Sequence, residues 1–526
     1  MKHTYWFLFA AVLSGCRVQS VLVEEATVDS GEVILDSPEE EVDDQIPSVV
    51  LPRDAMVGHL QALMDIAEAN GGNRAAGSPG YEASVAYVQS KLEAAGYTVR
   101  QHDFNIVDTL WEASPVVQIG DEPAFVLEED FYPLSYTGDG VIAAPIYAVN
   151  VMIPPGDEGA DSGCDAEDFV DFPPGAIALI QRGSCTFQIK SENAVAAGAT
   201  AVLIFNEGQS DRQDVFSGAL DESYENPLPV FALSYEAGVT LAELDEDTLV
   251  TVMSQVSYVA IPTQNIVAET GGDASRAVVV GGHLDSVGAG PGINDNGSGV
   301  AMILEMAVQI ANEGIEPDNQ LRFMFWGGEE LGLLGSMDYV FGLDEAERAN
   351  ILANLNFDMI ASPNPARMVY DGSGSMGGEG GPPGSAEIEE IFSAWFEGEG
   401  LTFQETPFDG RSDYGPFIWT GIPAGGLFTG AEQNMNSAEA EEYGGEAGLA
   451  YDECYHEGCD TMENLNLDML DEMAAAATDA SLQLGFFQGS FGGDGPYGPP
   501  SLERPEPRLP DMMPSGCGAH APIWRR

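Results

Sequence analysis

The stretch Arg276-Ala277-Val278-Val279-Val280-Gly281-Gly282-His283 decides the fold class, because it joins a short β-branched apolar run to two glycines and an imidazole. Such a run, apolar at every position, predicts a strand buried on both faces, as in a parallel sheet covered by helices. Residues Val300 to Ala307 are apolar at helical spacing and predict a helix after this strand. His283, and Asp295 just before the helix, are therefore expected on loops at strand or helix ends.

The same arrangement, a strand followed by acidic residues, recurs twice downstream. Leu321 to Trp326 predicts a second strand, and Glu329 and Glu330 follow its end. Leu352 to Phe357 predicts a third strand, with Asp358 directly after it. In open α/β sheets, ligands bind outside the carboxyl ends of the strands, so these acids are expected to meet in one crevice. The fold class is therefore predicted to be α/β.

The residue types at these predicted strand ends suit zinc, which accepts imidazole nitrogen and carboxylate oxygen. A catalytic zinc site also keeps one coordination position open for water or substrate. Adjacent glutamates, Glu329 and Glu330, allow one carboxylate to bind metal while its neighbour handles a proton. The competing interpretation is an ordinary structural histidine or an exposed loop acid, in a chain with 6 His and 86 Asp plus Glu.

Together these motifs resemble the M28 family of zinc aminopeptidases, particularly secreted bacterial members with two co-catalytic zinc ions. The resemblance runs from Leu51 to about Gly485. Three later motifs strengthen it, namely Gly410-Arg411-Ser412-Asp413-Tyr414-Gly415-Pro416-Phe417, Pro423-Ala424-Gly425-Gly426-Leu427-Phe428-Thr429-Gly430-Ala431-Glu432 and Cys454-Tyr455-His456-Glu457-Gly458-Cys459-Asp460-Thr461. The resemblance implies the zinc exopeptidase fold, in which a mixed, mostly parallel central sheet is flanked by helices.

The resemblance also implies a metal site with two Zn²⁺ per chain and five protein ligands. His283 and Asp358 match the ligands of one zinc ion, and Glu330 and His456 match those of the other. Asp295 matches the carboxylate that bridges the two ions. In the family a cis peptide bond follows this bridging aspartate, so a cis bond is expected here despite its cost of about 2.5–4 kcal/mol.

Four further residues match positions around the metal ions. Glu329 matches the general acid/base, and Tyr455 matches a phenol that hydrogen-bonds the oxyanion. Asp285 resembles a carboxylate that contacts the free nitrogen of a histidine ligand and so fixes its tautomer. Packing and capping are the alternatives for Tyr455 and Asp285. Arg411 matches a position near the substrate pocket, although an ordinary ion pair would suit it equally.

The expected function is a zinc-dependent aminopeptidase that hydrolyses N-terminal residues from peptides or protein N-termini outside the cytoplasm. The alternatives are a carboxypeptidase of the same superfamily and a non-catalytic, receptor-like binding protein, with glutaminyl cyclisation more remote. The chain has 18 Lys plus Arg against 86 Asp plus Glu, a formal net charge of −68. Such a charge argues against nucleic acid as a partner.

The N-terminus resembles a bacterial lipoprotein signal peptide. Lys2 and His3 precede the apolar run from Tyr5 to Leu13, and Ser14-Gly15-Cys16 ends it, so that Cys16 is the expected lipidated residue. The run is too short to span a bilayer. We therefore expect an exported protein that is lipid-anchored to a membrane of the cell envelope, with an ordinary secretory signal and a secreted protein as the alternative.

Export makes disulfides reasonable, because they persist in oxidising compartments. Cys454 and Cys459 bracket the second histidine ligand and form one expected pair, and Cys164 and Cys185 form the other. Zinc ligation by Cys454 or Cys459 is the competing interpretation, disfavoured because sufficient His and carboxylate ligands are present. With Cys16 lipidated, Cys517 is left over.

Composition and motifs divide the chain into six expected segments. Their predicted bounds are a lipoprotein signal peptide at 1–16, an acidic flexible tether at 17–50, the first part of a peptidase domain at 51–130, an insert at 131–256, the catalytic part of the peptidase domain at 257–486 and a Gly/Pro-rich tail at 487–526. Helices are expected from Met56 to Glu68, Tyr81 to Ala95 and Leu465 to Leu484, and a strand from Tyr97 to Phe104.

The insert resembles a smaller, β-rich protease-associated (PA) domain. Gly175 to Phe187, Lys190 to Gly198 and Ala201 to Asn206 predict strand, loop, helix and strand in that order. The insert contains no histidine, which makes a metal site there improbable. It is expected either to flank the active-site cleft or to act as a passive spacer.

Overall fold

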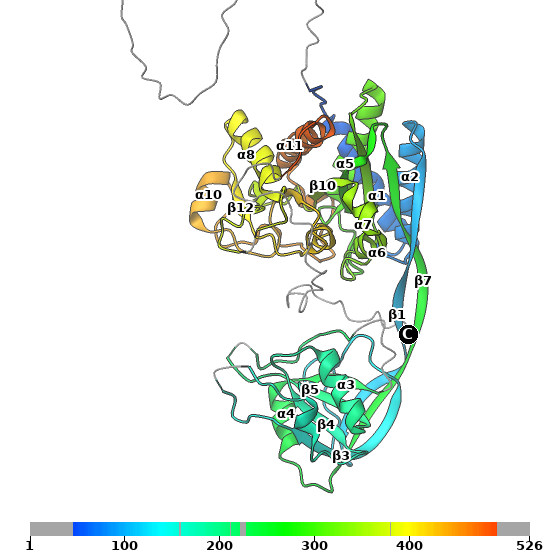
Figure 1. Cartoon of the computed structure of the whole chain (residues 1–526), viewed down its shortest axis with the longest axis vertical. Coiled ribbons are helices and arrows are strands. Elements are labelled where there is room, and N and C mark those ends of the chain that lie inside the picture. Colours follow the sequence, from blue (N-terminus) through cyan, green and yellow to red (C-terminus); the bar gives the residue numbers. More distant parts are fainter. Residues whose placement is uncertain (1–45, 157–158, 211, 221–227, 379, 492–526) are drawn as a thin grey trace, which may run out of the picture. The chain divides into compact units, whose positions relative to one another are not determined.

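The structure is a computed structural model that describes residues 46–156, 159–210, 212–220, 228–378 and 380–491 (Figure 1). The predicted signal peptide with its lipidated Cys16, most of the predicted tether and tail, and Cys517 lie outside the described residues. Within the described ranges, no helix combines the length and the apolar character that a membrane span requires.

The described chain forms a larger catalytic region and an insert within it. The catalytic region contains the following elements: α1 Arg53–Ala69, α2 Pro79–Ala94, β1 Val99–Ile119, β7 Leu249–Glu269, β8 Asp273–His283, α5 Gly297–Glu313, β9 Asn319–Trp326, α6 Leu334–Gly342, α7 Glu345–Ala349, β10 Ile351–Phe357, β11 Met368–Tyr370, α8 Ser385–Glu399, β12 Gln404–Thr406, α9 Gly415–Trp419, β13 Ala424–Phe428, α10 Ser437–Tyr443, the 3₁₀ turn Met462–Asn464 and α11 Leu467–Gly485. The insert contains β2 Phe131–Pro133, β3 Gly140–Val149, the 3₁₀ turn Ala166–Phe169, β4 Ile177–Gln181, α3 Phe187–Ala197, β5 Ala201–Phe205, β6 Val230–Leu233 and α4 Tyr235–Ala242.

The central sheet of the catalytic region is mixed and mostly parallel, as predicted. Its strands lie in the order β12-β11-β13-β10-β8-β9-β7. Strands β13, β10, β8 and β9 run parallel to one another, whereas β7 is antiparallel to β9 and β11 is antiparallel to β13. The four parallel strands therefore place their carboxyl ends at one edge of the sheet.

Strand β8 is buried on both faces, which explains its continuous apolar sequence. Val278 and Val280 pack into the large core to which α1, α2, α5, α8 and α11 contribute. Val279 points to the other face and packs with Met324 and Trp326 in a second cluster. Full burial of a valine stabilises the fold by roughly 1.5–3 kcal/mol, so both clusters anchor this central strand.

The helix predicted after His283 is α5, which carries the apolar run into the core. Its N-cap is Asn296, whose side chain accepts a hydrogen bond from the Gly299 amide. Gly314, at φ 67°, ends the helix in the left-handed region that glycine adopts without a Cβ clash. The start of α5 is thereby fixed directly behind the loop that contains Asp295.

One predicted strand is much longer than its sequence pattern indicates. The alternation from Tyr97 to Phe104 predicts a short strand, but β1 runs for 21 residues and pairs antiparallel with β7 from Val99–Ala268 to Ile119–Val250. Among the described side chains from Asn105 to Ser114, all except Ile106 are partly or fully exposed. Without a buried face, no apolar periodicity marks this part of the ribbon.

The insert is a small α/β unit with its own core. Strands β3, β4, β5 and β6 pair parallel in that order, and β2 adds to β6 antiparallel. The predicted order of strand, loop, helix and strand is confirmed by β4, α3 and β5. The predicted disulfide between Cys164 and Cys185 is present.

Candidate functional site

The candidate site lies where the parallel strands β8, β9 and β10 end. His283 is the last residue of β8 and pairs with Trp326, the last residue of β9. Glu329 and Glu330 lie in the turn that follows β9, and Asp358 directly follows β10. The sheet register therefore brings an imidazole and three carboxylates to one edge, as the sequence predicts.

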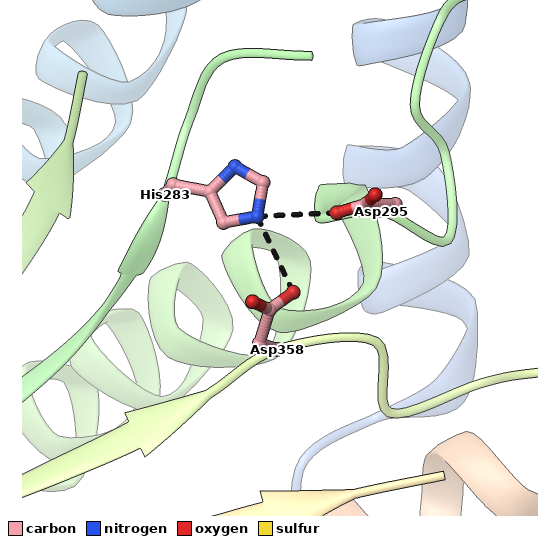
Figure 2. A group of neighbouring side chains, drawn as sticks. All are labelled: His283, Asp295 and Asp358. Atoms are coloured by element: carbon pink, nitrogen blue, oxygen red, sulfur yellow. Dashed lines mark hydrogen bonds and ion pairs between the residues drawn. The ribbon is translucent and has the colours of Figure 1, made fainter. Parts of the chain in front are cut away.

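The first group of side chains consists of His283, Asp295 and Asp358, and all three are buried (Figure 2). His283 Nε2 lies 3.2 Å from Asp295 Oδ1 and 3.3 Å from Asp358 Oδ1. Figure 2 shows the two carboxylates converging on this one ring nitrogen from different loops. The peptide bond from Asp295 to Asn296 is cis, as predicted.

The second group shares Asp295 with the first and adds Glu330 and His456. His456 Nε2 lies 3.3 Å from Asp295 Oδ2 and 3.1 Å from Glu330 Oε2. His456 has a φ of 60° and sits inside the loop closed by the predicted disulfide between Cys454 and Cys459. Asp295 therefore offers one carboxylate oxygen to each histidine.

These distances fit zinc coordination better than direct hydrogen bonding. Zinc–nitrogen and zinc–oxygen bonds of about 2.0–2.2 Å place neighbouring ligand atoms of a tetrahedron about 3.3–3.6 Å apart. Charge-assisted hydrogen bonds are shorter, about 2.7–2.9 Å. Each histidine Nε2 carries at most one hydrogen but faces two carboxylate oxygens. In addition, Glu330 Oε1 is buried and has no hydrogen-bond partner among the described residues. The donor set therefore fits a pair of zinc ions.

Without metal, the crowded acids and imidazoles shift one another's pKa values. Burial lowers the pKa of His283, but Asp358 and further carboxylates outweigh it and hold that pKa well above 6.5. Burial also lowers the pKa of His456, yet the neighbouring carboxylates of Asp295 and Glu330 raise it to about 10. The pKa of Glu330 is raised to about 7 by burial and by Asp295. The raised pKa values of both histidines show that the surrounding carboxylates favour a positive charge at these positions, which a metal cation would also supply.

Glu329 lies beside both groups. Its carboxylate is within 4.8 Å of donor atoms of His283 and Glu330. Burial raises the pKa of Glu329 well above 4.5, and Glu330 raises it further, against the opposing effect of His283. Asp285 holds this turn in place, because its carboxylate oxygens accept hydrogen bonds from the backbone amides of Glu329 (3.3 Å) and Glu330 (3.4 Å).

Asp285 contacts the Nδ1 side of the His283 ring. The nearest acceptor for His283 Nδ1 is the backbone oxygen of Asp285 at 3.2 Å. The carboxylate of Asp285 lies farther away, 3.7 Å from this nitrogen, which is an ion-pair distance rather than a hydrogen bond. Asp285 therefore approaches His283 Nδ1 with both its backbone oxygen and its carboxylate.

Tyr455 and Arg411 lie at the more exposed side of the site. The ring of Tyr455 stacks on that of His456, with centroids 3.8 Å apart. Burial, Asp295 and Glu329 together raise the pKa of Tyr455, which keeps the phenol protonated and able to donate a hydrogen bond. Arg411 Nη1 lies 3.1 Å from Glu432 Oε1, the ion pair that the sequence left open as its alternative role.

Three residues that contact the ligand-bearing loops carry no assignment from the sequence. Asp460, which is buried, accepts hydrogen bonds from the backbone amides of Asn294 (2.8 Å) and Asp295 (3.0 Å). Ser412 Oγ donates to Asp358 Oδ2 at 2.6 Å, and the buried Arg74 donates to the backbone oxygens of Pro291 and Gly292. The sequence does not indicate these contacts, because each joins residues that are far apart in the chain.

The clustered His, Asp and Glu donors define the class of site, a candidate metal centre at the carboxyl edge of an α/β sheet. The model of peptidase family M28 matches residues 265–481, and the PA domain model matches residues 143–241. The chain is 47% identical over 420 residues to an aminopeptidase of Pseudomonas aeruginosa, covering 79% of this chain and 78% of that protein. This chain therefore belongs to peptidase family M28 and carries an inserted PA domain.

Further relatives agree with this assignment. The chain is 39% identical over 459 residues to the probable lipoprotein aminopeptidase LpqL of Mycobacterium tuberculosis, covering 85% of this chain and 87% of that protein. Its fold is similar to the aminopeptidase from Aneurinibacillus sp. strain AM-1, with a TM-score of 0.62 at 24% identity over 82% of this chain and 94% of that one. The zinc aminopeptidase BSAP from Bacillus subtilis matches with a TM-score of 0.53 at 24% identity, over 83% and 95% of the two chains.

Proposed function

We propose that this chain is a zinc-dependent aminopeptidase that binds two zinc ions and removes N-terminal residues from peptides outside the cytoplasm. Membership of peptidase family M28 supports this function, as do relatives of 47% and 39% identity that are named aminopeptidases. The observation that carries the proposal is the position of Asp295, which presents one carboxylate oxygen to His283 and the other to His456.

The ligand sets follow from this shared aspartate. His283 and Asp358 would hold one zinc ion, Glu330 and His456 the other, and Asp295 would bridge them. When bound, zinc supplies Lewis acidity, and a single zinc ion can lower the pKa of a water molecule from 15.7 to about 7. The disulfide across the loop of His456 restricts the position of that ligand.

Glu329 is the proposed general acid/base. It is adjacent to the ligand groups but belongs to neither of the two sets that share Asp295. Its carboxylate accepts a proton from the attacking water and then passes a proton to the leaving amine. The hydrogen bonds from its turn to Asp285 fix its backbone while this transfer takes place.

Tyr455 and the acidic cluster complete the proposed site. The protonated phenol of Tyr455 donates a hydrogen bond to the developing oxyanion, an electrostatic contribution of about 2.7–4 kcal/mol in comparable sites. The carboxylates of the cluster hold the free α-amino group of the substrate, which restricts cleavage to the N-terminus. Arg411 would border the substrate pocket, held by its ion pair with Glu432.

Matched peptides test the direction of cleavage. The zinc-loaded protein should hydrolyse a free peptide and its C-terminally amidated form, and it should lose this activity when the N-terminus is acetylated. Loss of cleavage on amidation instead would identify a carboxypeptidase. Absence of turnover on all three peptides, at two zinc ions per chain, would favour a receptor-like binding protein.

The proposed location is the cell envelope, through a lipid on Cys16. A probable lipoprotein aminopeptidase among the relatives and two disulfides support export, because disulfides persist outside the reducing cytoplasm. A Cys16→Ser variant expressed in a bacterium should remain uncleaved at this position and incorporate no labelled palmitate, unlike the parent chain. Equal labelling of both chains would overturn the anchor.

A further inference from the structure

Arg74 is a fully buried arginine in the loop between α1 and α2. Its guanidinium hydrogen-bonds three backbone carbonyls rather than a carboxylate. Nε lies 2.9 Å from the oxygen of Pro291, Nη2 lies 2.6 Å from that of Gly292, and Nη1 donates to Leu284. In addition, the backbone amide of Arg74 donates to Ser286 Oγ at 2.9 Å. A single side chain therefore joins the two ends of the loop that connects β8 to α5.

The two ends of this loop adjoin His283 and Asp295, which are proposed ligands of one zinc ion. Leu284 directly follows His283 at the end of β8. Gly292 begins the turn around Asp295, and its oxygen also accepts the amide hydrogen of Gly297 at 3.0 Å, which closes this turn. Arg74 thus links the end of β8 to the turn around Asp295 and fixes the distance between His283 and Asp295.

The turn leaves little room for another arrangement. Gly292 has a φ of 62°, and a Cβ added there would lie 2.2 Å from the backbone oxygen of Asp295, 2.5 Å from Ser286 Cβ and 3.3 Å from Arg74 Nη2. Glycine is therefore required at this position. The guanidinium is packed against the turn itself, so a change in its shape is transmitted to Asp295.

The positive charge of Arg74 is balanced by nearby carboxylates of the candidate site. Burial lowers the pKa of Arg74 to about 10, against the opposing effect of Asp285, Asp460, Asp295 and Glu330. The side chain consequently remains a cation at neutral pH. A fixed cation beside these carboxylates reduces their mutual repulsion before a metal ion binds.

From these contacts we propose that Arg74 is a positioning residue that preorganises His283 and Asp295 for zinc. This inference rests on the proposed two-zinc function. Arginine suits this role because its planar guanidinium reaches several acceptors at fixed angles, whereas the ammonium of lysine is a single point. Arg74→Lys therefore keeps the charge but cannot reproduce contacts to three separate carbonyls.

Zinc titration of the metal-free protein against a competing chelator tests the proposal. Arg74→Lys should weaken binding of one of the two zinc ions by about 10- to 100-fold, the range typical of residues that orient metal ligands. The visible spectrum of its cobalt-substituted form should change, and excess zinc should restore much of the lost activity. Arg322→Lys is the matched control, because Arg322 is also largely buried but pairs with Glu269 and Tyr339. It should leave zinc affinity within twofold of the parent.

A milder variant covers the case in which Arg74→Lys fails to fold. Ser286→Ala removes the acceptor for the Arg74 amide and should weaken zinc binding by about threefold to tenfold, below the range for loss of a direct orienting contact. If Arg74→Lys folds and its zinc affinity is unchanged, Arg74 has a purely structural role. If Arg74→Lys does not fold, unchanged zinc affinity in Ser286→Ala leads to the same conclusion. If the parent protein itself binds no zinc, the proposed function fails instead.

Discussion

Glu329 and Glu330 are adjacent in sequence but are predicted to do different chemistry, which a pair of isosteric variants can separate. Glu329→Gln removes the proposed proton acceptor. The glutamine is isosteric with glutamate but cannot accept the proton of the attacking water. General acid/base catalysis contributes about 10²–10⁴-fold. We therefore expect kcat to fall by about 10³ or more, equivalent to about 4 kcal/mol of transition-state stabilisation.

The two variants should also differ in their zinc content. Glu329→Gln should retain two zinc ions per chain, because Glu329 belongs to neither of the two sets that share Asp295. Glu330→Gln replaces a proposed ligand and should retain about one zinc ion after dialysis. Steady-state kinetics on an N-terminally free peptide and elemental analysis of the same samples provide both measurements. A kcat within tenfold of the parent for Glu329→Gln at full zinc content would refute the assignment.

Three further predictions address stability. The Cys454→Ser/Cys459→Ser double variant removes a disulfide of sequence separation 5, which should cost about 2 kcal/mol in urea unfolding and weaken zinc binding. Loss of the disulfide between Cys164 and Cys185 in the insert, of separation 21, should cost about 3 kcal/mol and leave zinc affinity unchanged. With a net charge of −68, the melting temperature should rise between about 0.05 and 0.5 M NaCl as screening reduces self-repulsion, and a flat or falling curve would contradict this. Burial lowers the pKa of His59 from 6.5 against the opposing effect of Glu305, so the unfolded state binds more protons just below pH 6.5. The free energy of unfolding should therefore fall as the pH drops through this window. In His59→Gln this fall should be less steep, by up to about 1.4 kcal/mol per pH unit.

Much of the catalytic region follows from local sequence patterns. The apolar runs of β8, β9 and β10 predict strands because a central parallel strand is buried on both faces. Parallel strands share one carboxyl edge, which is why acids after each strand could be expected to converge. The cis bond after Asp295 and the two disulfides are confirmed as well. The cis bond was expected from family resemblance, and the disulfides were expected from export and the positions of the cysteines.

The contacts that support the ligand loops could not be predicted in the same way. Arg74 and Asp460 act through backbone groups of loops that are remote in sequence, and backbone groups leave no trace in side-chain patterns. The length of β1 was missed for a related reason, since a ribbon without a buried face shows no apolar alternation. Sequence patterns report burial, whereas these features depend on tertiary hydrogen bonding.

Anomalous diffraction at the zinc absorption edge, from crystals of the zinc-saturated protein, tests the central claim most directly. The proposed ligand sets predict two peaks about 3.5–4 Å apart with Asp295 between them. One peak should lie against His283 and Asp358, and the other against Glu330 and His456. A single peak, or none with both histidines hydrogen-bonded directly to Asp295, would contradict the two-zinc site.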